Sequence, residues 1–187
     1  VSGAGKEGID ELDAQVRDHS EGREMTANIL PSASAEKHYP IAFNLIPQID
    51  VFCDNLYTKE EMKMVNETKK IMEDYEMRIT ATTIRVPVYR SHSESVNIEL
   101  EKEVDLGAMR EALAKFPGVT VQDDPSKQEY PMPLYTSEKD DVYVGRLRRD
   151  ESCEKSYNIW VVGDQIRKGA ALNTLQIAET MIKNGWI

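Results

Sequence analysis

The chain has 187 residues, of which 40% are hydrophobic and 30% charged, a balance typical of one globular domain. Its net charge of −10, from 33 acidic and 23 basic residues, argues against nucleic acid or an anionic membrane surface as a partner. No apolar run approaches the roughly 18 residues that a membrane-spanning helix needs, and the N-terminus lacks the form of a signal peptide.

Two cysteines, Cys53 and Cys153, are too few for a disulfide framework and fit a reducing compartment, so we expect a cytoplasmic protein. Neither has the setting of a nucleophile, because one lies in an apolar run and the other in a polar turn. The histidines and cysteines do not show metal-ligand spacing, and we predict no metal site. The chain begins with VSGAG, without Met, and ends with NGWI, so we interpret it as part of a larger protein.

The N-terminal part is predicted to begin with a helix followed by irregular chain. Residues 6–20 have helical periodicity, with Ile9, Leu12 and Val16 on one face. Residues 21–40 contain Gly, Pro and Ser and little periodicity, which predicts a long loop.

The clearest helix covers residues 58–76. Thr58 is a good N-cap, and Glu61 three residues later completes a capping box. The apolar stripe consists of Met62, Val65, Met72 and Tyr75.

The rest of the chain combines predicted strands and helices. Strand candidates cover 78–89 and 95–102, and a helix covers 105–116. The later elements are a short strand at 119–124, a mobile insertion over 122–141 and a hairpin of strands at 142–150 and 156–164. A last helix covers about 167–184. Its inward residues are predicted to be Ala171, Leu175, Ala178 and Met181 or Ile182. Because the strands cluster instead of alternating with helices, we predict an α+β fold with a mixed, largely antiparallel sheet and helices on one face.

A polar interruption between the two strand candidates contains the first candidate site residue. Alternation stops at residues 90–94, Arg-Ser-His-Ser-Glu, and a turn there would present His92 at the end of a sheet. Histidine is the side chain best suited to move protons near neutral pH. Arg85, seven residues earlier, offers a planar two-pronged donor for a carboxylate. The alternative is a surface turn with a solvated histidine and an arginine in a surface ion pair.

Glu60 and Lys63 lie at positions i and i+3 of the capped helix, so they share a face. A carboxylate and an ammonium there could hold the amine of one ligand and the anion of another. The alternative is that Glu60 complements the helix dipole and Lys63 is its partner.

Two stretches with small residues precede helices, where backbone N–H groups could meet an anion. One is the SGAG turn, and the other is GDQIRKGAALN at 163–173. The first is not a GxGxxG motif and lacks a preceding strand. Plain helix starts are the alternative for both.

Five stretches, in this order and spacing, resemble the C-terminal domain of the aspartate-β-semialdehyde dehydrogenase family, in its Gram-positive form. They are SGAGKEGIDEL, AFNLIPQID, TKEEMK, IRVPVYRSHSESVNIEL and WVVGDQIRKGAALNTLQIAE. The resemblance runs over residues 1–187 and implies the substrate-binding and dimerisation domain of a homodimer, with the fold of glyceraldehyde-3-phosphate dehydrogenase-like C-terminal domains. It implies also that 165–187 is a terminal helix that would pack on a separate nucleotide-binding domain.

The family reduces β-aspartyl phosphate to aspartate semialdehyde with NADPH, releasing phosphate, in lysine, threonine, methionine and isoleucine biosynthesis. A cysteine attacks the acyl phosphate, and the resulting thioester is reduced. The resemblance implies that His92 is the acid/base, Arg85 binds the substrate α-carboxylate, Glu60 holds its amino group and Lys63 lies at the phosphate subsite. The residues implied to lie beside NADP are Ser2, Gly3, Ala4, Gly5 and Gln165.

The family's nucleophilic cysteine and cofactor loop belong to a segment that this chain lacks, and neither Cys53 nor Cys153 matches the nucleophile. We therefore predict that these 187 residues alone have no dehydrogenase activity. One alternative is a relative that reduces N-acetylglutamyl phosphate or a malonyl or succinyl thioester; Glu60 disfavours it, because only a free α-amine needs a negative partner. The other is a non-catalytic dimerisation module. The choice between NADP and NAD is left open.

Overall fold

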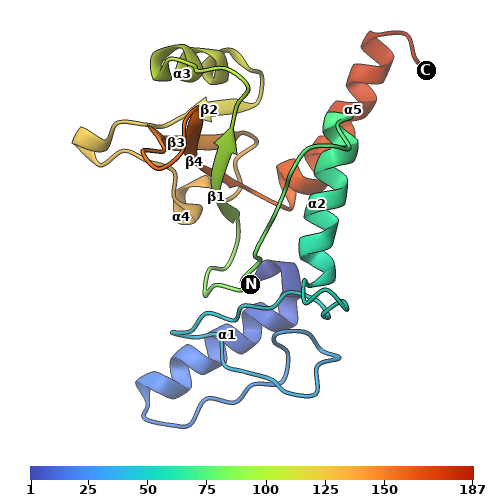
Figure 1. Cartoon of the computed structure of the whole chain (residues 1–187). Helices are drawn as coiled ribbons and strands as arrows, with labels where there is room; N and C mark the ends of the chain where they lie inside the picture. The colour runs from blue at the N-terminus through green and yellow to red at the C-terminus, as the bar shows by residue number, and fades with distance from the viewer. The chain divides into compact units, whose positions relative to one another are not determined.

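The computed structural model describes residues 1–187, which form two compact units, Val1–Tyr89 (unit 1) and Arg90–Ile187 (unit 2). Figure 1 shows that unit 1 consists of two helices and long connecting segments, whereas unit 2 contains the β-sheet. None of the helices combines the length and the apolar composition needed to cross a membrane.

Unit 1 contains the two helices that were predicted for it. A 3-10 turn, Ser2–Ala4, leads into α1, Gly5–Ser20. The second helix is α2, Lys59–Met72. The predicted loop over 21–40 is confirmed as irregular chain.

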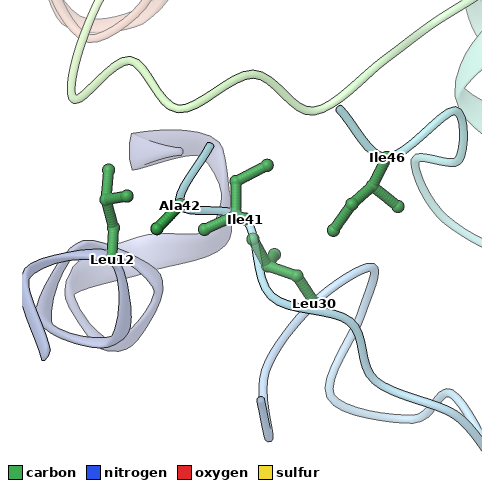
Figure 2. Close-up of a cluster of buried hydrophobic side chains, with 5 residues drawn as sticks. All are labelled: Leu12, Leu30, Ile41, Ala42 and Ile46. Carbon is green, nitrogen blue, oxygen red and sulfur yellow. The ribbon is translucent and has the colours of Figure 1, made fainter. Parts of the chain in front are cut away.

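The core of unit 1 joins α1 to irregular segments, as Figure 2 shows. Its buried side chains are Leu12, Leu30, Ile41, Ala42 and Ile46. Of the residues predicted to share an apolar face of this helix, Leu12 is buried, but 42% of the surface of Val16 is exposed, whereas Gln15 is 1% exposed. Gln15 is buried because its amide satisfies the backbone of the neighbouring loops, accepting from Ile41 N and Ala42 N and donating to Thr26 O.

Helix α2 begins where predicted and ends earlier. Thr58 and Glu61 form the expected capping box. The helix ends at Met72 because Glu73 adopts a left-handed conformation, with φ of 53°. Met72 and Tyr75 are mostly exposed, so the lower part of the predicted stripe is not buried in unit 1.

Unit 2 is built on a four-stranded sheet in the order β1-β4-β3-β2. The strands are β1 His92–Glu99, β2 Val119–Val121, β3 Val142–Arg149 and β4 Ser156–Gly163. Strand β4 pairs antiparallel with β1 and β3, and β2 pairs parallel with β3. The predicted α+β class, with a mixed and largely antiparallel sheet, is confirmed, as is the β3–β4 hairpin.

The helices of unit 2 flank this sheet and follow it. Helix α3, Leu106–Lys115, is capped by Asp105 and packs against β2 and β3. The segment 122–141, predicted as a mobile insertion, contains a 3-10 turn, Pro125–Lys127, and a one-turn helix, α4 Pro133–Thr136, beside β4. A π-helical turn, Arg167–Ala171, precedes α5, Leu172–Lys183.

Two strand predictions need correction. Residues 78–89 form no strand and contribute only an isolated bridge between Arg85 and Ile46; Pro87 lacks the N–H that a ladder requires. Conversely, β1 begins at His92, not at 95, because its backbone pairs with β4 from Gly163 onward. Polar side chains are tolerated there because β1 is an edge strand with exposed residues.

The last helix is confirmed, and of its predicted inward residues only Ala178 and Met181 are partly buried. Ala171, Leu175 and Ile182 are exposed, the latter two at 62% and 64%. Helical periodicity identifies an apolar face of α5 without identifying what covers it. Packing of this helix on another domain remains a prediction.

Candidate functional site

The start of α2 holds Glu60 and Lys63 in the first turns of the helix. Lys63 Nζ lies 3.9 Å from Glu60 Oε1, and the two side chains are 55% and 36% exposed. An ion pair this long and this exposed contributes little to stability. Either group can therefore leave this ion pair and bind a charged ligand with little loss of free energy.

Glu61, the next residue, is buried and connects α2 to the segment that leads to Arg85. One carboxylate oxygen accepts from Thr58 N and the other from Thr83 N, both at 2.8 Å. Burial opposes ionisation of this carboxyl, but the hydrogen bonds from Thr58 and Thr83 outweigh it and hold the pKa of Glu61 below its usual value. A charged, fixed Glu61 sets the start of the helix against residues 83–85.

Arg85 is anchored by its backbone, which exchanges hydrogen bonds with Ile46 at 2.8 and 3.1 Å. Its Nε is buried and has no hydrogen-bond partner in the structure. Burial lowers the pKa of the Arg85 guanidinium, and the nearby Glu60 carboxylate opposes that shift. A partly buried guanidinium with an unused donor is prepared to receive a planar anion.

The SGAG turn lies against the same arginine. A Cβ atom added at Gly3 would come 3.2 Å from Arg85 Nη1, a tight contact. The turn is held by a 3.0 Å hydrogen bond from Ser2 N to Tyr89 O. Glycine therefore lets the backbone approach the guanidinium closely.

Unit 2 contains the other two candidate residues, His92 and Gln165. His92 begins β1 and pairs with Gly163 of β4, and its side chain is on the exposed edge of the sheet. Gln165 follows β4 and accepts a 2.9 Å hydrogen bond from the N–H of Ser91. A hydrogen bond thus joins Gln165 to Ser91, the residue directly before His92.

The predicted site residues accordingly fall into two groups. Within unit 1 the structure brings together Arg85, Glu60, Lys63 and the SGAG turn. Within unit 2 it joins the backbone next to His92 to Gln165. The prediction of a turn over residues 90–94 is wrong in detail, because strand β1 begins at His92.

Sequence reasoning missed two buried carboxylates beside these groups. The capping box identified Glu61 as a cap, but its bond to Thr83 joins residues 22 positions apart and leaves no local signal. Asp164 belongs to a stretch predicted as a helix start, and the structure shows that its side chain is completely buried. The sequence signal available for it was an acidic residue directly after a predicted apolar strand.

The two cysteines differ in exposure. Cys53 is half-buried, Cys153 is exposed, and both are free thiols. No group of three or more His, Cys, Asp or Glu side chains is arranged to hold a metal ion.

The family model described as semialdehyde dehydrogenase, dimerisation domain, matches residues 1–168. The chain belongs to this family. Proteins named aspartate-semialdehyde dehydrogenase are 48% identical to it in Aquifex aeolicus, over 100% of this chain and 53% of the relative, and in Bacillus subtilis, over 98% and 53%. The chain spans about half the length of the curated relatives it matches, and its resemblance to the family is confirmed.

Solved semialdehyde dehydrogenase structures share the fold. Aspartate semialdehyde dehydrogenase II from Vibrio cholerae superposes with a TM-score of 0.88 at 42% identity, over 98% of this chain and 52% of that one. A second structure of that protein, complexed with ASA, gives a TM-score of 0.87 at 42% identity, over 97% of this chain and 52% of that one. The enzyme with NADP from Candida albicans, at 20% identity and a TM-score of 0.64 over 97% and 65%, shows the likeness of fold alone.

Proposed function

We propose that this chain is the C-terminal, substrate-binding and dimerisation part of an aspartate-semialdehyde dehydrogenase that reduces β-aspartyl phosphate with NADPH and releases phosphate. The observation that carries the proposal is the cluster in unit 1, where a partly buried guanidinium with an unused donor lies near a carboxylate and an ammonium. An α-amino acid presents a carboxylate and an ammonium on one carbon, and this cluster offers a partner for each.

Unit 1 would bind and orient the substrate. Arg85 would receive the α-carboxylate, because a guanidinium binds a carboxylate through two parallel N–H donors. Glu60 would accept from the α-ammonium, and Lys63 would attract the phosphate. Holding the α-carbon groups at one end of the substrate and the phosphate at the other would orient the acyl carbon for attack.

His92 of unit 2 would move the protons. It would take the proton of the attacking cysteine thiol, which belongs to another part of the enzyme, as the sulfur–carbon bond forms and the bond from carbon to phosphate breaks. After the thioester accepts a hydride, His92 would stabilise the oxyanion of the tetrahedral intermediate. The aldehyde would then form as the carbon–sulfur bond breaks and the electron pair returns to the cysteine sulfur. The position at the start of an anchored strand favours this role over that of a mobile surface histidine.

The residues proposed to lie beside NADPH fit one end of that cofactor. The SGAG turn exposes bare backbone at Gly3, and Gln165 offers an amide fixed by Ser91. These residues would hold the nicotinamide, whereas the chain has no glycine-rich loop for the pyrophosphate. The bound cofactor supplies the hydride.

Two further expectations belong to the same proposal. A homodimer is supported by the family's description as a dimerisation domain. A cytoplasmic location is supported only by the two free cysteines, and it remains a prediction.

The experiment is a turnover assay of the full-length protein that contains this chain. We expect phosphate-dependent reduction of NADP with aspartate semialdehyde, and no turnover by residues 1–187 alone. The panel includes N-acetylglutamyl semialdehyde with phosphate, and malonyl and succinyl thioesters with NADPH. Preference for any of these over the aspartyl substrate would overturn the substrate assignment, and inactivity on all would favour a non-catalytic module.

Glu60→Gln tests the assignment of the amine. We expect KM for aspartate semialdehyde to rise at least tenfold, because the ammonium loses its anionic partner. Glu67→Gln, a change at an exposed position of the same helix, is the matched control and should leave KM unchanged. An unchanged KM in Glu60→Gln would remove Glu60 from the substrate site.

A further inference from the structure

Asp164 is a buried carboxylate at the end of β4 that the proposed mechanism does not use. It is completely buried; one of its oxygens accepts two hydrogen bonds, and the other accepts one and forms an ion pair. Oδ1 accepts from Ile166 N at 2.9 Å and from Arg167 N at 3.1 Å. Oδ2 accepts from Glu138 N at 2.6 Å and pairs with Arg90 Nε at 2.7 Å.

These four donors come from three separate segments of unit 2. Ile166 and Arg167 lie at the start of the π-helical turn that precedes α5, Glu138 follows α4, and Arg90 stands two residues before His92. Capping of the π-helical turn accounts only for the first two bonds. The other two serve to bring distant segments to one point.

The residue between Arg90 and His92 is held by the same segments. Ser91 donates its N–H to Gln165 Oε1 at 2.9 Å, and its hydroxyl lies 3.0 Å from the Ser137 hydroxyl. Ser91 has a φ of 76°, a left-handed conformation that costs a non-glycine residue free energy. Such a conformation persists only where its surroundings enforce it.

The electrostatics require a charged acid at this position. Burial opposes ionisation of Asp164, but three backbone N–H groups and Arg90 outweigh it and hold the pKa of the carboxyl below its usual value. An asparagine would fill the same volume, but its NH₂ cannot accept, so at least one buried donor would be left without a partner.

We propose that Asp164 is a positioning residue for His92: with Arg90 and Ser137 it fixes the strained Ser91 and so sets where β1 begins and where the imidazole stands. The inference rests on the proposed function, because it concerns the residue that moves protons there. Displacement of a catalytic group by about 1 Å lowers rates roughly 100-fold.

The test is Asp164→Asn in the full-length protein, with kcat and KM for aspartate semialdehyde measured well below the unfolding midpoint. We expect kcat to fall between 10- and 100-fold and KM to change less than threefold, because the groups proposed to bind substrate lie in unit 1. Ser137→Ala removes one support of Ser91 and should lower kcat about threefold.

Asp123→Asn is the matched control. Its side chain is 1% exposed and pairs with Arg110 at 2.7 Å, so it is a comparable buried ion pair in unit 2 that contacts neither Ser91 nor Gln165. It should lower the unfolding midpoint less than Asp164→Asn does, because one oxygen of Asp123 already lacks a partner, and it should leave kcat unchanged.

The outcomes separate the two proposals. If the unmodified protein does not turn over aspartate semialdehyde, the proposed function fails. If it does and Asp164→Asn keeps its kcat, or loses it no more than Asp123→Asn, the positioning role is wrong. Should Asp164→Asn not fold, Arg90→Gln, which leaves the acid and its backbone bonds in place, is judged by the same kcat and KM criteria.

Discussion

Unit 1 and unit 2 are held together in different ways, although each positions part of the proposed site. In unit 2 the ladders of four strands satisfy most of the central backbone. In unit 1 no extended ladder exists, and buried side chains take over this work: Gln15 satisfies three backbone groups and Glu61 satisfies two. Buried polar side chains can satisfy backbone groups where secondary structure is lacking, but each such side chain then contributes more to the stability of the unit.

The units also divide the proposed chemistry. Arg85, Glu60 and Lys63, in unit 1, would bind substrate, and His92, in unit 2, would move protons. Substitutions in unit 1 should therefore act mainly on KM, and those at His92 on kcat.

The largest effect is expected from His92→Ala. We expect kcat to fall by about 10²- to 10⁴-fold, the usual contribution of general acid–base catalysis, with little change in the unfolding midpoint because the side chain lies on an exposed edge. His38→Ala, in unit 1, is the control and should retain full turnover. A near-normal kcat in His92→Ala would show that the histidine has no part in the chemistry.

The next largest effect is expected from Gln15→Leu. It tests whether unit 1 depends more than unit 2 on hydrogen bonds from side chains to the backbone. Three buried backbone groups would lose their partners, and we expect the free energy of unfolding to fall by about 3 kcal/mol. In unit 2, Thr120→Val removes a 2.7 Å bond to Asp141 but leaves the ladder, and should cost about 1 kcal/mol. Urea unfolding measures both, and equal costs would contradict the comparison.

Arg85→Lys should raise KM for aspartate semialdehyde about 10- to 50-fold and change kcat only a few-fold. An ammonium keeps the charge but cannot form the two parallel bonds to a carboxylate. Arg17→Lys, at an exposed position of α1, should leave the steady-state kinetics as they are. A fall in kcat without a rise in KM would move Arg85 from binding to chemistry.

Glu61→Gln should cost about 2 kcal/mol of stability at pH 7, since the amide cannot accept on both sides. The pKa of Glu61 is lower in the folded protein than the 4.5 of a free side chain. Its contribution is therefore present above about pH 4.5 and is lost as the pH falls through the folded value. Unfolding midpoints between pH 6 and 3 should fall less steeply in Glu61→Gln; parallel curves would mean that Glu61 is not the titrating group.

The smallest effect is expected from Gly3→Ala. The added methyl would meet Arg85 Nη1 at 3.2 Å, and a flexible guanidinium can retreat by a few tenths of an ångström. KM should rise about threefold with no change in stability. A rise as large as that of Arg85→Lys would mean that the turn itself contacts substrate.

Features with a short-range signal could be predicted from the sequence. The capping box at Thr58, the α3 helix with its end before Pro117, and the β3–β4 hairpin all depend on residues within a few positions of each other. Resemblance to a family supplied the candidate site residues, which periodicity and spacing alone did not distinguish from surface charges.

Features that depend on distant partners could not be predicted. Residues 78–89 alternate like a strand but have no neighbouring strand, and β1 extends to His92 because β4 lies beside it. The exposed face of α5 likewise has an apolar pattern without a partner in unit 2.

The sequence by itself determined the class of the fold, the longer helices and the acidic surface, because propensity, capping and charge are properties of neighbouring residues. The family was indicated by a resemblance over the whole chain. Only the tertiary structure decided that Gln15, Glu61 and Asp164 are buried, and which backbone groups they satisfy. A buried polar side chain is stable only where donors from distant segments converge on it, and that convergence is created by folding.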